Sequence, residues 1–184
     1  MTKAITRERL QRAALRLFAE RGYDQTTVAD IAAAAGVTSM TFFRYFGSKE
    51  LVVLEDPYDP AIAAAVAGQP RDWPALERVR CGLLAAWEGI EDTEDTELRL
   101  RLSIGAAHAG LRARMRENNA ATEAAIVAAL TAQGVSRFEA TVAAAAAIGA
   151  LTAALLEWAA HPGCGSMGEA VRSALRLLGP GGTQ

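Results

Sequence analysis

Residues 26–51 of the chain read TTVADIAAAAGVTSMTFFRYFGSKEL, and this run has the pattern of two short helices joined by a turn. Thr27 is a suitable N-cap, and Asp30 lies three residues later, which is the spacing of a capping box. Gly36 interrupts the alanine run, and Thr38 can cap a second short helix. Two short helices separated by three or four residues that include a glycine indicate a helix-turn-helix.

Helical patterns continue on both sides of this motif. Downstream, residues 48–54 are predicted to form a fourth helix, and Pro57 disfavours helix at the residue before it. Helical segments then alternate with glycine, proline and acidic breaks, so we expect an all-α chain of about nine helices. We place a helix-turn-helix domain in residues 1–47 and a second helical domain in residues 48–184. Upstream, a helix ending near residue 21 is predicted from an apolar stripe at Leu10, Ala13, Ala14, Leu17 and Phe18.

Composition excludes some classes of protein, and the charge distribution favours one kind of partner. Of the 184 residues, 51% are hydrophobic and 22% are charged, which argues against intrinsic disorder. Residues 1–50 hold eight basic and five acidic side chains, a net charge of +3; the remainder holds 11 basic and 16 acidic ones, a net charge of −5. Unless this asymmetry is chance, only the N-terminal segment is suited to meet a polyanion.

The helix over residues 39–46 has the features of a recognition helix. Phe42 and Phe46 share a side that can pack on the preceding helices, so Met40 and Arg44 point the other way. Arg44 can donate two parallel hydrogen bonds to guanine in a major groove. The alternative is a small three-helix core whose surface happens to carry basic residues. The candidate DNA-binding residues are Thr27, Thr38, Ser39, Met40, Thr41, Phe43, Arg44, Tyr45 and Lys49.

Three segments, Gly22–Ala32, Ala35–Thr38 and Thr41–Leu51, resemble the TetR family of transcriptional regulators. The match covers roughly residues 5–55, and the rest of the chain is similar in size and helical character. The Phe-Phe-Arg-Tyr-Phe version of the motif is more weakly similar to regulators of the mycofactocin kind. The resemblance implies phosphate contacts by four residues, Thr27, Thr41, Tyr45 and Lys49, and groove contacts by four others, Ser39, Met40, Phe43 and Arg44.

The sequence departs from the family pattern at two positions. Phe43 stands where the family often has tyrosine, so a hydroxyl-to-phosphate hydrogen bond is lost. Ala29 stands where some members place a base-reading arginine, so we expect the first helix of the motif to read little sequence.

The resemblance implies a homodimer, and the sequence supports one independently. Residues 140–156 contain no charged side chain, so this segment is too apolar for a helix with one face in solvent. A membrane span is disfavoured because the run is mostly alanine and lacks flanking aromatic belts. The alternatives are a partner helix from a second subunit and burial within one subunit. The candidate interface residues are Ala143, Ala147, Leu151, Leu155, Val171, Leu175 and Leu178.

The resemblance also implies an effector cavity within the second domain. Bulky side chains among alanines leave room for an apolar small molecule, and His108 or Arg112 could orient a polar end. Ordinary core packing is the alternative role for each candidate. The candidate lining residues are Leu83, Leu84, Trp87, Ile104, His108, Leu111, Met115 and Trp158.

The sequence offers little for an enzyme. Residues 163–168 fit GxGxxG literally, but they follow a helix rather than a strand, which predicts a loop and an N-cap. The two histidines and two cysteines show no metal-ligand spacing, so neither a metal nor a cofactor is expected. Cys81 and Cys164 lie far apart and suit reduced thiols, which favours a cytoplasmic protein.

These observations predict a ligand-responsive regulator, in the first place a repressor, that binds double-stranded operator DNA as a homodimer. Alternatives are an activator, an effector-independent regulator, or a helical small-molecule-binding protein with a vestigial DNA-binding head. We expect the Asp56–Pro60 break to carry motion from the body to the head.

Overall fold

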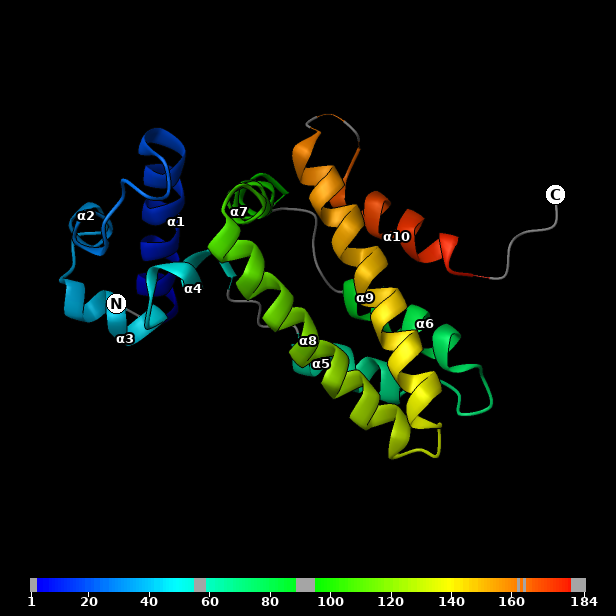
Figure 1. The fold of residues 1–184 in the computed structure, drawn as a ribbon. Coiled ribbons are helices and arrows are strands. Elements are labelled where there is room, and N and C mark those ends of the chain that lie inside the picture. The colour runs from blue at the N-terminus through cyan, green and yellow to red at the C-terminus, as the bar shows by residue number, and fades with distance from the viewer. Residues whose placement is uncertain (1–2, 55–58, 89–94, 162, 164, 180–184) are drawn as a thin grey trace. The chain divides into compact units, whose positions relative to one another are not determined.

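The computed structural model is all-helical over the residues that it describes, which are all except 1–2, 55–58, 89–94, 162, 164 and 180–184 (Figure 1). The all-α prediction is confirmed, and the described residues form ten helices where about nine were predicted. The predicted break at Asp56–Pro60 lies largely outside the described residues. The helices are α1 (Lys3–Arg21), α2 (Val28–Ala34), α3 (Ser39–Phe46), α4 (Lys49–Leu54), α5 (Asp59–Ala67), α6 (Ala75–Glu88), α7 (Asp95–Ala107), α8 (Ala109–Thr131), α9 (Arg137–Ala160) and α10 (Met167–Leu177).

The chain forms two compact units, and each of them combines two separate stretches of the sequence. The N-terminal unit combines residues 1–55 with residues 96–112, and the C-terminal unit combines residues 56–95 with residues 113–184. Helix α7 and the first turn of α8 therefore belong with the helix-turn-helix. These units are defined by spatial contacts, whereas the predicted division between residues 47 and 48 separates DNA binding from effector binding and dimerisation. That functional division stays a prediction.

The core of the N-terminal unit follows from the periodicity of its helices. All five residues of the predicted α1 stripe are buried, as are Ile31 of α2 and Val52 of α4. Phe42 and Phe46 are also buried, and their ring centroids lie 5.6 Å apart. Helix α3 packs against α2 and α4 with this face inward, so the other face is available to a partner.

Side-chain hydrogen bonds cap the N-termini of α2 and α10. The Thr27 hydroxyl accepts a hydrogen bond from the Asp30 amide, and the Asp30 carboxylate accepts one from the Thr27 amide, which completes the predicted capping box. Hydrogen bonds from Thr27 hold the pKa of the Asp30 carboxyl below its ordinary value. Ser166 and Glu169 form the same box at the start of α10, within and just after the segment where the sequence predicts an N-cap.

Gly36 turns the chain between α2 and α3 with a φ of +65°, a conformation that disfavours any side chain. A Cβ atom at this position would also lie 3.2 Å from Nη2 of Arg9. Gly110 in α8 differs, because a Cβ there would meet no atom within 4 Å. The two glycines of the same unit therefore predict opposite effects of an added methyl group.

Gly36→Ala is expected to destabilise the protein by about 1–2 kcal/mol because the left-handed conformation becomes strained. Gly110→Ala is the matched control, and it should stabilise the protein slightly because alanine favours helix. Thermal unfolding followed by circular dichroism measures both. An unchanged or raised Tm for Gly36→Ala would show that the turn is not constrained as described.

The C-terminal unit is built around α9, which packs against α6 and α10. Helices α5 and α6 cross closely at Gly82, where a Cβ would lie 2.7 Å from Val66. Helix α9 is long and apolar enough to span a membrane, with a mean hydropathy of 1.7 and 33% of its most apolar window buried in the protein. A core helix of a folded domain meets the same criteria, so this is weak evidence for a span.

Candidate nucleic-acid interface

Helix α3 has an outward face on which apolar side chains are exposed to solvent. Met40 is 83% exposed and Phe43 is 51% exposed, whereas Phe42 between them and Phe46 are buried. The helix is held by Thr38, whose hydroxyl accepts a hydrogen bond from the Thr41 amide. The predicted division of α3 into an inner and an outer face is thus what the structure shows.

Arg44 lies on this exposed face and keeps its guanidinium accessible. Its Cζ lies 5.4 Å from the ring centroid of Tyr45, so the ring supports the arginine side chain from one side. A guanidinium held in this way can offer two N–H donors to one acceptor pair. Ser39, in the first turn of α3, is half-buried.

The residues predicted to contact phosphates differ in how their polar atoms are used. The Thr38 and Thr41 hydroxyl oxygens lie 3.2 Å apart at the start of α3. Thr27 is exposed at the start of α2, although its hydroxyl is engaged in the capping box. Tyr45 is half-buried. Helix N-termini suit anions, and Thr27 and Thr38, the N-caps of α2 and α3, are both exposed.

Lys49 is directed into the protein rather than outward. Its ammonium donates hydrogen bonds to the carbonyl oxygens of Tyr23 at 2.8 Å and Thr26 at 3.1 Å. It also lies 4.1 Å from the centroid of the Tyr23 ring. Lys49 therefore fastens the turn that precedes α2, and its predicted phosphate contact stays a prediction.

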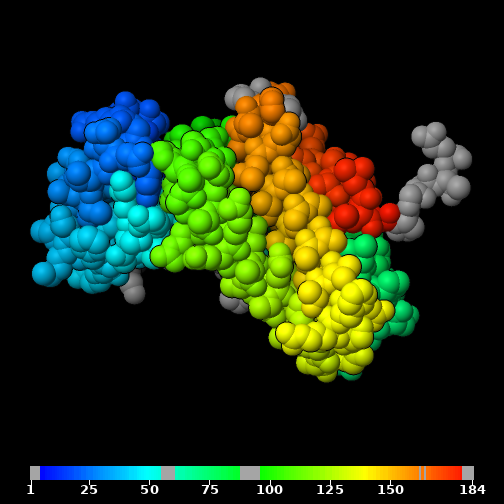
Figure 2. Space-filling model, in the orientation of Figure 1, coloured from blue at the N-terminus to red at the C-terminus, as the bar shows by residue number. Residues whose placement is uncertain are grey.

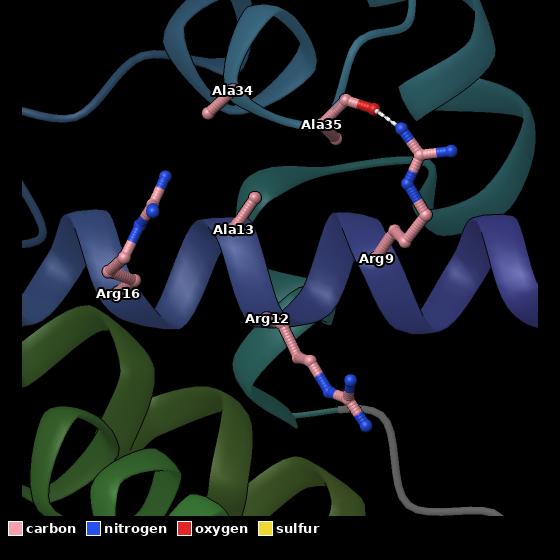
Figure 3. A pocket seen from close by; sticks show the side chains of 6 residues that line it. All are labelled: Arg9, Arg12, Ala13, Arg16, Ala34 and Ala35. Atoms are coloured by element: carbon pink, nitrogen blue, oxygen red, sulfur yellow. Dashed lines mark hydrogen bonds between the residues drawn. The ribbon is translucent and has the colours of Figure 1, made fainter.

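Three arginines of α1 line a hollow of about 240 Å³ beside the end of α2. In Figure 3, the side chains of Arg9 and Arg16 extend toward α2, whereas Arg12 extends away from it. Arg9 donates a hydrogen bond of 2.5 Å to the Ala35 carbonyl oxygen, and Arg12 pairs with Glu8. Arg9 thereby holds the turn between α2 and α3, a contact that the sequence did not predict.

The residues predicted to line one effector cavity are divided between the two units. Ile104, His108 and Leu111 lie in the N-terminal unit, and His108 faces Tyr23 and Asp24 there. The other five belong to the C-terminal unit, so a single cavity with this lining stays a prediction. The five are Leu83, Leu84, Trp87, Met115 and Trp158.

The C-terminal members of this set show different polar environments. Leu83 is fully buried, and Trp158 is buried with its indole N–H donating to the Gly165 carbonyl oxygen at 3.1 Å. The indole N–H of Trp87 is buried without a hydrogen-bond partner. Core packing accounts for Leu83 and Trp158, while Trp87 keeps an unused donor.

Most of the predicted dimer residues are core residues of one chain. Five of the seven are at most 7% exposed, because they pack where α6, α9 and α10 meet, and only Leu155 and Leu178 are half-buried. A side chain buried in its own chain offers little surface to a second copy, and the assignment of these five residues to a dimer interface stays a prediction. The five are Ala143, Ala147, Leu151, Val171 and Leu175.

Comparison with known families identifies the chain. A family model described as "Bacterial regulatory proteins, tetR family" matches residues 10–55, and one described as "MftR C-terminal domain" matches residues 73–183. The chain belongs to the TetR family. The first match contains the whole helix-turn-helix with the exposed face of α3. Members of this family are DNA-binding transcriptional regulators and not enzymes, as predicted from the sequence.

Individual relatives agree with this assignment. The regulator TcmR of Streptomyces glaucescens is 40% identical over 91 residues, which are 48% of this chain and 40% of TcmR. The chain thus spans less than half the length of that relative.

Solved structures share the fold over nearly the whole chain. NalD of Pseudomonas aeruginosa, the secondary repressor of a multidrug efflux pump, is 22% identical with a TM-score of 0.61, covering 95% of this chain and 94% of NalD. FadR of Thermus thermophilus, in complex with lauroyl-CoA, is 27% identical with a TM-score of 0.52, covering 94% of this chain and 92% of FadR.

Proposed function

We propose that the protein is a cytoplasmic, ligand-responsive repressor that binds a quasi-palindromic operator as a homodimer and is released by a small hydrophobic effector. The observation that carries the proposal is the outward face of α3, where Met40, Phe43 and Arg44 stand exposed on a helix anchored by Phe42 and Phe46. The net charge of +3 in residues 1–50 suits this face to DNA.

In this proposal α3 lies in the major groove. Arg44 reads guanine through its two parallel donors, and Met40 and Phe43 contact thymine methyl groups or the groove wall. Ser39 donates to a base or a phosphate. The residues at the N-termini of α2 and α3, Thr27, Thr38 and Thr41, hold the phosphate backbone together with Tyr45.

Binding of the protein to a duplex from its own upstream region tests the proposal. Fluorescence anisotropy of labelled DNA should show saturable binding whose affinity falls by orders of magnitude between about 50 and 200 mM salt. An unrelated duplex of equal length is the control. Weak binding that is equal for both duplexes would leave a vestigial head as the better account.

Lys49→Ala is expected to weaken binding to operator and unrelated duplexes by a similar factor, about 3- to 10-fold. The reason is that the ammonium both carries charge and fastens the turn before Thr27. Anisotropy titrations at several salt concentrations measure it, with Arg114→Ala on the exposed face of α8 as the control. A salt slope reduced by about one assigns a direct phosphate contact. A loss confined to the operator would contradict the expectation.

The proposed dimer uses the exposed side of α9 and α10. These helices lie side by side on one face of the C-terminal unit, α9 yellow to orange and α10 red in Figure 2. An open, mainly apolar groove of about 660 Å³ lies between them, and Leu177, which helps to line it, is 86% exposed. Small residues in the groove allow close approach of helices from a second copy. They include Ala150, Ala153, Ala154, Ala170 and Ser173.

The effector is proposed to be hydrophobic and to bind in the C-terminal unit. FadR of Thermus thermophilus was solved in complex with lauroyl-CoA, which supports an effector with an acyl chain. The unpaired indole N–H of Trp87 offers a donor for one polar atom of such a ligand. To release the operator, the effector must bind the DNA-free state more tightly than the DNA-bound state.

A further inference from the structure

We propose that Arg78 in the C-terminal unit binds the carboxylate of an amphipathic ligand, so that the proposed effector is an apolar molecule with a single negative charge. The inference rests on the proposed function where it identifies this ligand with the effector. The site itself depends on contacts within the C-terminal unit, to which Arg78, Gln133 and Ala67 all belong.

Arg78 is a buried cation with unused hydrogen-bond donors. The residue is fully buried. Its Nη2 donates a hydrogen bond to Oε1 of Gln133, whereas Nε and Nη1 are buried without a hydrogen-bond partner among the described residues. Buried donors in folded proteins nearly always have a partner, so two unused ones on a single side chain indicate an acceptor that the protein itself does not supply.

The positive charge of Arg78 is also unpaired, because no carboxylate in the part of the chain that the structure describes forms an ion pair with it. The neighbouring Glu77 pairs with Arg80 instead and accepts a hydrogen bond from Cys81. Hydrogen bonding to Arg80 holds the pKa of the Glu77 carboxyl below its ordinary value. Arginine keeps its proton when it is buried, and a buried charge without a counter-charge is strongly unfavourable. An anion is therefore the missing partner.

Three helices meet at the Arg78 guanidinium and hold it in place. Arg78 lies in the first turn of α6, and Gln133 follows the end of α8. The Gln133 side chain accepts the hydrogen bond from Arg78 and donates one of 3.0 Å to the carbonyl oxygen of Ala67, the last residue of α5. A ligand would thus meet a pre-positioned group, which lowers the entropy that binding costs.

The surroundings of Arg78 are apolar. One turn further along the same face of α6, Gly82 allows α5 to approach so closely that a Cβ atom would lie 2.7 Å from Val66. Val66 and Leu130 are fully buried, and the carbonyl oxygen of Leu130 accepts a hydrogen bond from the Gln133 backbone N–H at 3.0 Å. An ion pair is stronger in such a low-dielectric environment than in water, and the hydrocarbon part of a ligand finds apolar neighbours there.

One unpaired positive charge selects a ligand with one negative charge. The guanidinium has five N–H donors, and Gln133 accepts a hydrogen bond from one of them, so the two oxygens of a carboxylate can accept two parallel ones. A phosphate monoester with two negative charges would leave a net charge buried, and a neutral alcohol would leave the charge of Arg78 unpaired. A carboxylate with an apolar tail meets both requirements of the site.

Thermal unfolding with and without ligand tests the site in the absence of DNA. Octanoate and 1-octanol at equal concentration are the probes, because they have the same number of carbon atoms and differ in charge. Saturating octanoate should raise the Tm of wild type by about 5 °C or more, and 1-octanol should raise it less. Arg78→Met replaces the guanidinium by an apolar side chain and should abolish this difference. Arg137→Met, which changes an exposed arginine of α9, is the matched control and should keep it.

Gln133→Glu is a second variant that tests the site without removing Arg78. The new carboxylate lies where the amide oxygen accepts the hydrogen bond from Arg78, so it supplies within the chain the charge that the ligand would bring. The substitution removes the hydrogen bond to the Ala67 carbonyl oxygen but leaves the size of the side chain unchanged, so the protein should fold. Octanoate and 1-octanol should then have equal effects on its Tm.

Equal effects of the two probes on wild type, or a preference for octanoate that persists in Gln133→Glu or Arg78→Met, would overturn the inference. Anisotropy of labelled operator then tests the identification with the effector, since octanoate should weaken operator binding by wild type but not by Gln133→Glu. An octanoate-specific rise in Tm with unchanged operator affinity would contradict that identification and leave the carboxylate site in place. Absence of operator binding by wild type would remove the proposed DNA-binding function alone.

Discussion

Ala153→Arg is expected to convert the protein to a monomer and to reduce its operator affinity by about 100-fold or more. Ala153 is exposed in the middle of α9 and lines the apolar groove shared with α10. A guanidinium there would be buried in the proposed interface without a partner, at a cost of about 3 kcal/mol or more. The loss of one half of the dimer removes the second recognition helix from the operator.

Light scattering measures the oligomeric state, and anisotropy of labelled operator measures the affinity. Ala128→Arg is the matched control, since Ala128 is an exposed alanine of α8 outside this groove. It should stay dimeric with unchanged affinity. An Ala153→Arg protein that remains a dimer and binds operator like wild type would place the interface elsewhere.

Arg44→Ala is expected to cost about 1–3 kcal/mol at the operator and to relax the sequence preference at one position of each half-site. The physical reason is the loss of two parallel donors that only arginine supplies. Arg44→Lys separates charge from geometry, because lysine keeps the charge but cannot form the planar pair. It should restore part of the affinity but not the preference.

Competition between operator duplexes with single base-pair changes measures this preference. Binding of unrelated DNA should fall much less than binding of the operator. If Arg44→Ala discriminated among these duplexes as wild type does, the base-reading role would have to be given to another residue of α3.

Local signals predicted most of the fold. The capping box at Thr27 and the apolar stripe of α1 depend on residues three or four positions apart, and both are found in the structure, as are the turn at Gly36 and the N-cap before α10. The inward and outward faces of α3 follow from the same spacing. Such features are set by neighbouring residues, so one sequence is sufficient to find them.

The dimer residues stay a prediction, because residues 140–156 of α9 carry no charged side chain on any face to mark which one meets a partner. Large side chains such as Leu151 are predicted to meet the partner, and in the single chain Leu151 is buried. The exposed side carries Ala153 and Gly149 instead. Periodicity distinguishes apolar from polar faces, and it has no means of separating two apolar faces with different partners.

Long-range contacts explain why the positions of His108 and Lys49 were not predicted from the sequence. Asp24 and His108 are far apart in the sequence, and nothing near either residue indicates that they meet. For this reason His108 was grouped with an effector cavity rather than with the head. The direction of Lys49 likewise depends on two carbonyl groups more than twenty residues away, so a family position alone did not reveal its role.

Selection of bound sites from a random duplex pool tests the central proposal most directly. The protein should enrich two half-sites related by a dyad, with centres about one or more helical turns apart and a guanine in each half-site whose enrichment depends on Arg44. Repetition with a metabolite extract should reduce recovery of these sites. Failure to enrich any sequence, or enrichment unaffected by Arg44→Ala, would contradict the assignment of the exposed face of α3 to DNA.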